Sequence, residues 1–519
     1  MHSQLPLSFA DDLETNARWY ADDLAYAQDD RRITHAELLS RAKRLGSALH
    51  RAGARRQDRI GILSMNSIEF GETMAATQWS GFVLSTVNFR LAPPEIEYII
   101  KDGAPKIFIF EAQYLPIIES LRCKLTSVET YVCIGGETDW ATNYDAFVAG
   151  GDPAGPPLRA REEDIWCLIY TSGTTGRPKG CVWGHREMRQ LVQVDAWLCD
   201  MQHPDRTLIV MPMFHLGGLV ISLSQHVRGG CAYLYRQFDP VETMKAIERD
   251  RLTILLLAPT MVQMLLDAPG IERADLSSVR TLIYSAAPMP SPTLRKAIEL
   301  FGRCNFVNLF GQTEICMFCL SPLQHRPDGT ERERKWLTSV GKPYPNLHAR
   351  IVDEDGNECP PNVAGEIVAR SGAMFRGYWN NSIATLETLR DGWCHTGDMG
   401  RIDEDGFLYL VDRKKDMIIT GGENVYSREV EEAVLQHPAV SECAVIGLPD
   451  PKWGENVCAI VTLRRDGIAS EGEIIEHTRL LIASYKKPKK VIFADNLPKL
   501  VTGKVNKVEL RRLYGSATR

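Results

Sequence analysis

Short apolar runs alternate with segments of helical periodicity in the first 160 residues of this 519-residue chain. Apolar residues recur at helical spacing over residues 35–52 and 68–79, and the runs 59–63 and 106–110 are short enough to be buried strands. Such alternation is typical of an α/β fold in which helices cover a largely parallel sheet. Because the chain is too long for one ordinary core, we expect several subdomains.

A loop rich in glycine and threonine follows another apolar run, residues 165–170. The stretch from Tyr170 to Gly180 reads YTSGTTGRPKG. Glycines let backbone N–H groups turn toward an anion, hydroxyl groups can donate to it, and Lys179 adds positive charge. The spacing is not that of the common phosphate-binding loop, in which four residues separate the first glycine from Gly-Lys-Ser/Thr. Composition alone therefore leaves two interpretations, a phosphate site or a polar surface loop.

Overall composition narrows the class of protein. A charged share of 24% and a net charge of -6 give no electrostatic reason to expect a nucleic-acid partner. The N-terminal stretch lacks a basic segment followed by an apolar one, and no apolar run approaches the roughly 20 residues that span a bilayer. We therefore expect a cytoplasmic protein with no transmembrane segment. The 13 cysteines are irregularly spaced, which favours reduced packing residues over a disulfide framework.

Three later stretches carry candidate binding chemistry. Residues 308–314, NLFGQTE, place an aromatic ring, a hydroxyl and a carboxylate close together, which could stack on a base, meet a phosphate and hold Mg²⁺. Residues 393–398, WCHTGD, end in an acid that could accept hydrogen bonds from ribose hydroxyls. The small-residue turn 285–288 follows a strand-like run. It could form a wall beside a flat group, because ligands of α/β sheets bind outside the carboxyl ends of strands.

Five stretches together resemble the adenylate-forming superfamily. Besides the three motifs YTSGTTGRPKG, NLFGQTE and WCHTGD, the chain contains DRKKDMIITGGENV at 412–425 and PKLVTGKVNK at 498–507, in the order and approximate spacing of that family. The resemblance covers essentially the whole chain and is closest to the acyl-CoA synthetases, relatives of firefly luciferase and of peptide-synthetase adenylation domains. It implies a large N-terminal domain with mainly parallel sheets over residues 1–413, a small mobile α+β domain over residues 414–519, and a hinge near Lys415.

The resemblance implies a reaction in two steps. A carboxylic acid would be activated by ATP and Mg²⁺ to an acyl-adenylate, and the acyl group would pass to the thiol of coenzyme A, with AMP and pyrophosphate as the other products. The alternatives are a long-chain fatty acid–CoA ligase and an adenylate-forming enzyme with another acceptor, such as a luciferase-like enzyme or a carrier-protein ligase. A homodimer is left open.

The resemblance also assigns residues to ATP. Lys504 matches the lysine that approaches the carboxylate and the α-phosphate, Thr313 would contact the α-phosphate, and Glu314 would hold Mg²⁺. The β- and γ-phosphates would be held by Thr171, Ser172, Gly173, Thr174, Thr175 and Lys179.

Further assignments concern the base, the ribose and coenzyme A. Phe310 would stack on adenine, although tyrosine is frequent in the family at this position. The opposite wall would be Ala286, Ala287 and Pro288, and Asn308 and Gly311 would complete the nucleotide site. Asp398 and Arg413 would bind the ribose. The loop that lines the pantetheine tunnel in related enzymes is matched by Gly421, Gly422 and Glu423.

The acyl pocket is assigned to residues of mixed character. They are Phe214, His215, Gly217, Tyr284, Ile315 and Cys316. Aromatic, sulfur and aliphatic side chains suit an aromatic, cinnamyl-like or medium-chain acid and do not choose among them. An amino-acid substrate would need a buried acid near Phe214 to pair with its ammonium group, and residues 208–226 contain none.

A basic cluster lies near the C-terminus and consists of Lys486, Lys487, Lys489 and Lys490. Lysine clusters are usually solvated, so we expect an exposed face, with contact to the phosphates of coenzyme A as the sharper alternative.

Overall fold

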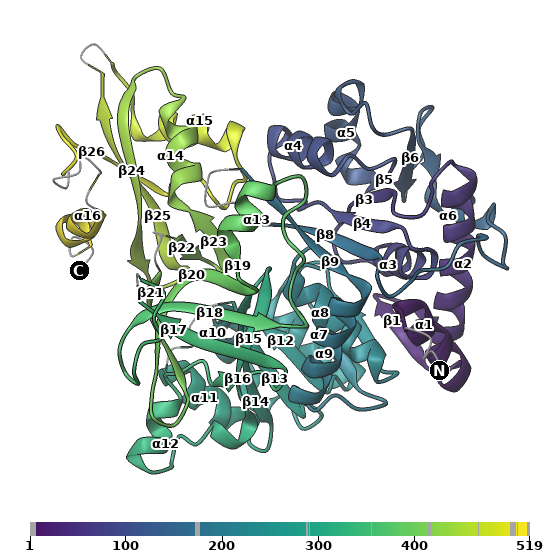
Figure 1. Ribbon diagram of the computed structural model, residues 1–519, viewed down its shortest axis with the longest axis horizontal. Helices are drawn as coiled ribbons and strands as arrows, with labels where there is room; N and C mark the ends of the chain where they lie inside the picture. The colour runs from purple at the N-terminus through teal and green to yellow at the C-terminus, as the bar shows by residue number, and fades with distance from the viewer. Residues whose placement is uncertain are drawn as a thin grey trace. The chain divides into compact units, whose positions relative to one another are not determined.

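The computed structural model describes residues 7–171, 177–286, 289, 291–353, 355–413, 417–464, 467–498, 505 and 507–515 (Figure 1). The chain forms two compact units. The larger contains Met1–Phe89, Ile100–Tyr170 and Gly180–Val411, and the smaller contains Arg90–Ile99, Thr171–Lys179 and Asp412–Arg519. The predicted boundary after residue 413 lies two residues beyond this division, and the two short inner segments of the smaller unit were not predicted. Lys415 lies outside the described residues.

A nine-stranded sheet forms one half of the larger unit. In spatial order its strands are β16 (Lys342–Pro343), β15 (Ile315–Leu320), β14 (Asn305–Gln312), β13 (Thr281–Ser285), β12 (Ile254–Leu257), β10 (Arg206–Ile209), β11 (Cys231–Leu234), β1 (Leu24–Gln28) and β2 (Arg31–Thr34). The strands from β14 to β1 pair in parallel, and the pairs β14–β15, β15–β16 and β1–β2 are antiparallel. The sheet therefore has a parallel centre with antiparallel edges.

A seven-stranded sheet forms the other half of the larger unit. Its strands are β7 (Thr142–Asn143), β6 (Thr130–Ile134), β5 (Ile107–Glu111), β3 (Arg59–Leu63), β4 (Val83–Thr86), β8 (Ile165–Thr171) and β9 (Lys179–Gly184). The pairs from β7 through β8 are parallel. The apolar runs that the sequence identifies as strands thus occupy β3, β5 and β8, and the predicted mainly parallel α/β fold is confirmed.

Helices separate and cover these sheets. They are α1 (Phe9–Trp19), α2 (His35–Arg51), α3 (Ile68–Ser80), α4 (Pro93–Gly103), α5 (Leu115–Leu121), α6 (Tyr144–Ala149), α7 (His185–Leu198), α8 (Leu216–Val227), α9 (Pro240–Asp250), α10 (Pro259–Leu266), α11 (Ser291–Phe301), α12 (Glu331–Trp336) and α13 (Ser382–Thr388), with short 3₁₀ turns at Ala112–Tyr114, Arg122–Lys124, Ile271–Arg273 and Pro322–Gln324. Helix α2 begins with a capping box, because Thr34 and Glu37 each accept the other's backbone N–H. None of the described helices is both long and apolar enough to span a membrane.

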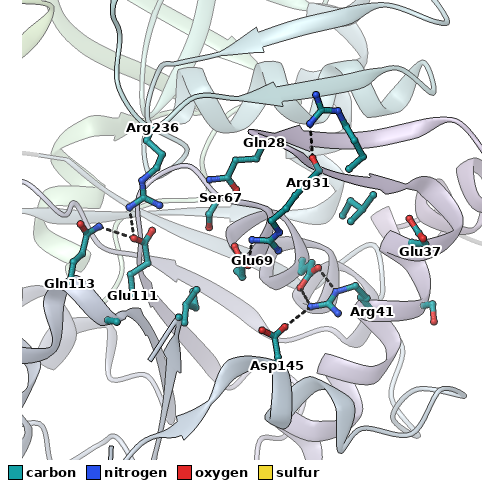
Figure 2. Close-up of a pocket in the computed structure, with 17 residues that line it drawn as sticks. Gln28, Arg31, Glu37, Arg41, Ser67, Glu69, Glu111, Gln113, Asp145 and Arg236 are labelled. Atoms are coloured by element: carbon teal, nitrogen blue, oxygen red, sulfur yellow. Dashed lines mark hydrogen bonds and ion pairs between the residues drawn. The ribbon is translucent and has the colours of Figure 1, made fainter. Parts of the chain in front are cut away.

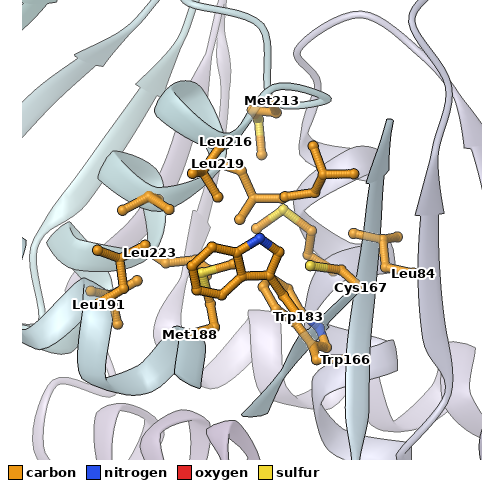
Figure 3. Packing of buried hydrophobic residues seen from close by; sticks show 14 of the residues in the cluster. Leu84, Trp166, Cys167, Trp183, Met188, Leu191, Met213, Leu216, Leu219 and Leu223 are labelled. Carbon is orange, nitrogen blue, oxygen red and sulfur yellow. The ribbon is translucent and has the colours of Figure 1, made fainter. Parts of the chain in front are cut away.

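Successive side chains along each strand of the nine-stranded sheet point to opposite faces, so they pack into two different cores. In β12, Ile254 and Leu256 belong to the core shared with the seven-stranded sheet, whereas Leu255 and Leu257 pack with α9, α10 and α11. The shared core contains α7 and α8, and Figure 3 shows Trp183 at its centre among apolar side chains of these helices. The larger unit is therefore built around helices packed between two sheets.

A smaller antiparallel sheet completes the larger unit. It consists of β17 (Leu347–Val352), β18 (Gly365–Ser371), β20 (Trp393–Ile402), β19 (Leu389–Arg390) and β21 (Leu408–Arg413). The smaller unit has its own mixed sheet of β23 (Glu423–Tyr426), β22 (Met417–Thr420), β25 (Gly454–Leu463), β24 (Val440–Asp450) and β26 (Lys490–Phe493), with helices α14 (Ser427–Leu435), α15 (Glu471–Leu481) and α16 (Lys507–Tyr514). This confirms the predicted small α+β domain.

The predicted lysine face is wrong at one position. Lys486 is only 1% exposed, and its Nζ lies 2.6 Å from Oε1 of Glu429 on α14. A buried ammonium group needs such a partner, because burial without one is strongly unfavourable. Lys489 and Lys490 are exposed, as predicted. Lys486 is therefore a structural residue of the smaller unit.

Candidate active site at the strand ends

The motif NLFGQTE forms a hairpin at the carboxyl end of the parallel sheet. Strand β14 carries its first five residues, Thr313 and Glu314 form the turn, and β15 returns with Gln312 opposite Ile315 and Gly311 opposite Cys316. The register shifts between Phe310 and Gly311. A Cβ at Gly311 would lie 2.6 Å from Cα of Cys316, so only glycine fits there. The bulge and the tight pairing together place Thr313 and Glu314 at the sheet edge.

Two buried aromatic residues hold this turn. The Tyr378 hydroxyl donates to Oε1 of Glu314 at 2.6 Å, and Nε1 of Trp183 donates to the carbonyl oxygen of Thr313 at 2.9 Å. The backbone N–H of Phe375 donates to the Glu314 carbonyl at 2.9 Å. Burial, and then the neighbouring Glu314 carboxylate, raise the pKa of Tyr378 far above its usual value, so the phenol remains a donor.

Glu314 fits the predicted role of a Mg²⁺ ligand. Its side chain is 8% exposed and is oriented by Tyr378. Among the described residues, no group of three or more His, Cys, Asp or Glu is placed to hold a metal ion. Mg²⁺ in nucleotide enzymes usually takes one or two carboxylates and completes its shell with water and phosphate oxygens. A single oriented carboxylate is therefore compatible with Mg²⁺ that arrives with ATP.

The ends of β13 and β14 bring several predicted nucleotide residues together. Ser285 donates from its hydroxyl to the carbonyl of Leu309 at 2.7 Å, and Asn308 donates from Nδ2 to the carbonyl of Tyr284 at 3.3 Å. Oδ1 of Asn308 is buried and has no hydrogen-bond partner within the described part of the chain. Ala286 follows β13 with φ 73°, an unusual conformation for a residue other than glycine. Ala287 and Pro288 lie outside the described residues.

Phe310 is half-buried, and its ring centroid lies 6.4 Å from that of Phe318. The predicted stacking of Phe310 on adenine stays a prediction.

The ends of the predicted phosphate-binding loop lie on the seven-stranded sheet. Thr171 ends β8 and Lys179 begins β9, while Ser172, Gly173, Thr174 and Thr175 lie outside the described residues. The Tyr170 hydroxyl donates to Oδ2 of Asp102 at 2.8 Å. A Cβ at Gly180 would lie 3.0 Å from Cζ of Tyr170, so this glycine allows the strand to pack on the ring.

The predicted ribose-binding acid follows a glycine turn in β20. Gly397 has φ 72°, and its N–H donates to Oε1 of Glu366 at 3.1 Å. The backbone N–H of Asp398 donates to the Thr396 hydroxyl at 3.1 Å. Only the backbone of Arg413, the last residue of β21, is described. The ribose roles of Asp398 and Arg413 therefore stay predictions.

Three of the predicted acyl-pocket residues lie at the start of α8. Phe214 is buried edge-to-face against Phe89 at 5.2 Å, and His215 is the N-cap of the helix. Gly217 is exposed, and no described atom lies within 4 Å of a Cβ built on it. A Cβ on Gly218 would instead lie 2.5 Å from the carbonyl oxygens of Met211 and Pro212. Gly218 is therefore required by packing, whereas a side chain at 217 would enter open space.

Tyr284 lies on the other face of the sheet from the shared core. Its side chain is 2% exposed and packs with the cluster of α9, α10 and α11. The Tyr284 hydroxyl and Nε2 of His325 are 2.9 Å apart, and burial lowers the pKa of His325 to about 4, so this imidazole is neutral at pH 7. The proposed contact between Tyr284 and the acid stays a prediction.

Gly421 and Gly422 form a tight hairpin turn between β22 and β23. Their φ values are 60° and 81°, and Thr420 pairs with Glu423 across the turn. Positive φ at both central positions is the requirement of a type I′ turn, which glycine meets without strain. The turn accounts for both glycines locally, and their contact with coenzyme A stays a prediction. Lys504 lies outside the described residues.

The sequence interpretation missed one buried acid. Asp195 on α7 is 2% exposed, and burial raises its pKa to about 7. Burial and then the Asp195 carboxylate raise the pKa of the Cys316 thiol, which places Asp195 beside a predicted pocket residue. Asp195 lies outside residues 208–226, the stretch that contains no acid. The available signal was the spacing of Asp195 from Met188 and Leu191, which puts it on the apolar face of the helix.

A separate hollow of about 850 Å³ contains none of the predicted site residues (Figure 2). Arg31 lies 2.6 Å from Glu69, Arg236 lies 2.5 Å from Glu111, and Arg41 pairs with Glu72 and Asp145. Because these cations are already neutralised by carboxylates, the hollow is a poor site for the phosphates of ATP.

Comparison with known proteins identifies the family. The protein-family model described as AMP-binding enzyme matches residues 13–379. The family model described as AMP-binding enzyme C-terminal domain matches residues 429–504. The chain belongs to the AMP-binding enzyme family. The resemblance to adenylate-forming enzymes is thereby confirmed.

Individual relatives match nearly the full length. A feruloyl-CoA synthase from Amycolatopsis sp is 36% identical over 93% of this chain and 94% of its own. A long-chain-fatty-acid–CoA ligase from Mycobacterium tuberculosis is 34% identical over 94% of each chain. The solved structure of an amide bond synthetase from Marinactinospora thermotolerans has a TM-score of 0.88 and 30% identity, and the match covers 98% of this chain and 100% of that one.

Removing the Tyr378 hydroxyl tests its support of Glu314. Tyr378→Phe should lower ATP turnover about 10- to 100-fold and raise the Mg²⁺ concentration for half-maximal activity, because a charge-assisted hydrogen bond contributes about 1.5–3 kcal/mol. Pyrophosphate release during Mg²⁺ titration measures both effects. Tyr131→Phe is the matched control, since its buried hydroxyl has no partner in the described structure. Unchanged Mg²⁺ dependence in Tyr378→Phe would contradict the role of this hydrogen bond.

Adjacent glycines on α8 allow a paired test of the acyl pocket. Gly217→Leu should leave thermal stability unchanged and raise KM for bulky acids more than for small ones, because the new side chain enters open space. Gly218→Ala should lower stability by about 1–3 kcal/mol, because it overpacks against two carbonyl oxygens. Thermal unfolding and acid-dependent kinetics report the two outcomes. If folded Gly217→Leu kept the acid preference of the wild type, position 217 would not line the pocket.

Proposed function

We propose that this chain is an AMP-forming acid–thiol ligase that activates a carboxylic acid with ATP and Mg²⁺ and transfers the acyl group to coenzyme A. The family matches span both parts of the chain. The observation that carries the proposal is the strand-end turn, in which Thr313 and Glu314 are fixed by Trp183 and Tyr378. Fixed polar groups at a strand end suit the binding and orientation of a nucleotide.

The first half-reaction needs charge compensation more than proton transfer. A substrate carboxylate oxygen attacks the α-phosphorus, the bridging P–O bond to the β-phosphate breaks, and pyrophosphate leaves. The nucleophile is already ionised at pH 7, so no general base is required. Mg²⁺ held at Glu314 would supply positive charge beside the phosphates, and Lys504 would supply it at the carboxylate and the α-phosphate.

The second half-reaction moves the acyl group. The thiol sulfur of coenzyme A attacks the acyl carbon, the bond from that carbon to the AMP oxygen breaks, and the thiol proton passes to solvent. A positively charged lysine is no longer needed at the carbonyl once the substrate carboxylate has become an uncharged acyl group. Rotation about a hinge near Lys415 would remove Lys504 and open a path for pantetheine.

The acid is proposed to be aromatic, cinnamyl-like or medium-chain. Support comes from the mixed lining of the predicted pocket and from the feruloyl-CoA synthase relative. The long-chain-fatty-acid–CoA ligase relative keeps a long-chain acid as the alternative. A second candidate acceptor is an amine, since an amide bond synthetase shares the fold with a TM-score of 0.88.

A pyrophosphate-release screen tests the activity. Aromatic, short, medium and long acids are each supplied with ATP and Mg²⁺, in the presence of coenzyme A, of a primary amine, or of neither. Release that depends on coenzyme A, with formation of acyl-CoA, supports the ligase. Turnover with the amine and not with coenzyme A would replace it by an amide synthetase. No release with any acid would refute adenylation.

The role of Lys504 separates the two half-reactions. Lys504→Ala should lower adenylation about 100- to 1,000-fold, because an electrostatic contact to the transition state is lost. Thioester formation from supplied acyl-adenylate should be largely preserved. Lys490→Ala is the control, because Lys490 is an exposed lysine of the same unit. Equal loss of both half-reactions in folded Lys504→Ala would contradict the two-conformation account.

A further inference from the structure

The buried Asp195 carboxylate is unusual for its position. Helix α7 buries Met188, Leu191, Val192 and Ala196 on one face, and Asp195 lies on this face among them. Helical spacing of three, four and seven residues places these side chains together against the shared core. An ionisable group here would ordinarily be replaced by an apolar one, since burial of a carboxylate is strongly unfavourable unless it is paired.

Asp195 is incompletely paired within the protein. Its Oδ1 is buried and accepts no hydrogen bond from any described residue, and the buried Tyr344 hydroxyl is likewise without a partner. Burial raises the pKa of Asp195 to about 7, and the neighbouring Tyr344 hydroxyl opposes this shift only partly. The Tyr344 hydroxyl acts on Asp195 as a hydrogen-bond donor but does not reach the geometry of a full hydrogen bond, so Oδ1 of Asp195 remains unsatisfied within the described structure. Such groups are rare in folded proteins and call for an explanation such as a ligand.

The neighbours of Asp195 connect it to the predicted acyl pocket. The backbone N–H of Tyr344, the neighbour of Asp195, donates to the carbonyl of Met317 on β15 at 2.8 Å, and after burial the Asp195 carboxylate also raises the pKa of Cys316 and Cys319. Both cysteines lie on β15, which begins directly after Glu314. At about 3.3 Å per residue, positions 316 to 319 lie roughly 7–17 Å along the strand from Glu314. Asp195 therefore lies beside β15, away from the position near Glu314 where the carboxylate of the substrate acid is proposed to react.

We propose that Asp195 determines substrate specificity by accepting a hydrogen bond from a hydroxyl or amino group at the end of the acid remote from its carboxylate. This inference rests on the proposed ligase function and names the substrate class of the same site. A donor on the substrate would satisfy Oδ1, whereas an acid without a donor would leave this oxygen unpaired. Sites of this kind reject the analogue that lacks the donor.

Acids with one carbon skeleton provide the test. Cinnamic, 4-hydroxycinnamic and 4-aminocinnamic acids are compared by kcat/KM for pyrophosphate release with the full-length enzyme, ATP, Mg²⁺ and coenzyme A. The wild type should favour one or both donor-bearing acids over cinnamic acid by about 10- to 100-fold. The comparison of the hydroxyl with the amine shows which donor the site prefers.

Substitutions assign the preference to Asp195. Asp195→Leu should reduce it to within about threefold while cinnamic acid is still used, and Asp195→Asn should retain part of it through a neutral acceptor. Tyr344→Phe is the matched control, because it removes the neighbouring hydroxyl and leaves the carboxylate. Should Asp195→Leu not fold, the nearly isosteric Asp195→Asn variant decides, with an expected loss of preference of at least about threefold.

Thermal unfolding distinguishes specificity from a structural role. Asp195→Leu should unfold at the same or a higher temperature, because it removes a buried carboxylate that the protein does not fully pair. Turnover by the wild type without a preference for a donor, or a preference unchanged in the folded Asp195 variants, would overturn the inference while leaving the ligase function intact. Failure of every acid to release pyrophosphate would instead refute the ligase function.

Discussion

The hydrogen bond between Tyr378 and Glu314 is the contact on which the strand-end site depends. The proposed Mg²⁺ role of Glu314 requires its side chain to be held in one place, and the Tyr378 phenol, whose pKa is raised by burial, holds it as a permanent donor. The backbone holds the same residue independently, through the Phe375 N–H and the bridge between Ile315 and Met374. The sheet positions the turn that carries Glu314, and the segment after β18 restrains the backbone and side chain of this residue. Neither alone would fix both the main chain and the carboxylate.

Local patterns in the sequence predicted much of the architecture. The runs 59–63 and 165–170 became β3 and β8, because short apolar segments between turns have few alternatives to burial in a parallel sheet. The turn 285–288, which the strand-end rule indicated, does begin where a strand ends, because β13 ends at Ser285. What the patterns omit are contacts across large sequence separations. Trp183 and Thr313 are 130 positions apart, and nothing near either one indicates the other.

Lys486 and Asp195 show that the local sequence does not predict the partners of a buried charged residue. Lys486 lies among other lysines, so the local sequence predicts that its side chain is exposed to solvent. The side chain is buried instead, and it is paired with Glu429, which lies 57 positions earlier. Asp195 lies on an apolar helix face, so its spacing predicts burial, but the partners that decide its role belong to β15 and to the segment around Tyr344. In both cases the partners of the charged group come from distant parts of the chain, so only the tertiary structure identifies them. Charged groups are where these two sources of information diverge most, because burial changes their energetics more than those of apolar residues.

Trp183 connects the shared core to the turn that carries Thr313 and Glu314. Its ring lies in the middle of the shared core in Figure 3, while its single N–H reaches the carbonyl of Thr313. Close packing transmits small displacements, so a shift in Met188 or Leu219 can move the turn without any change in the residues that meet substrate. In a mutational scan, a band of core positions should therefore score as functionally sensitive while remaining folded. A map of activity loss on this enzyme would outline the support of the site as well as the site itself.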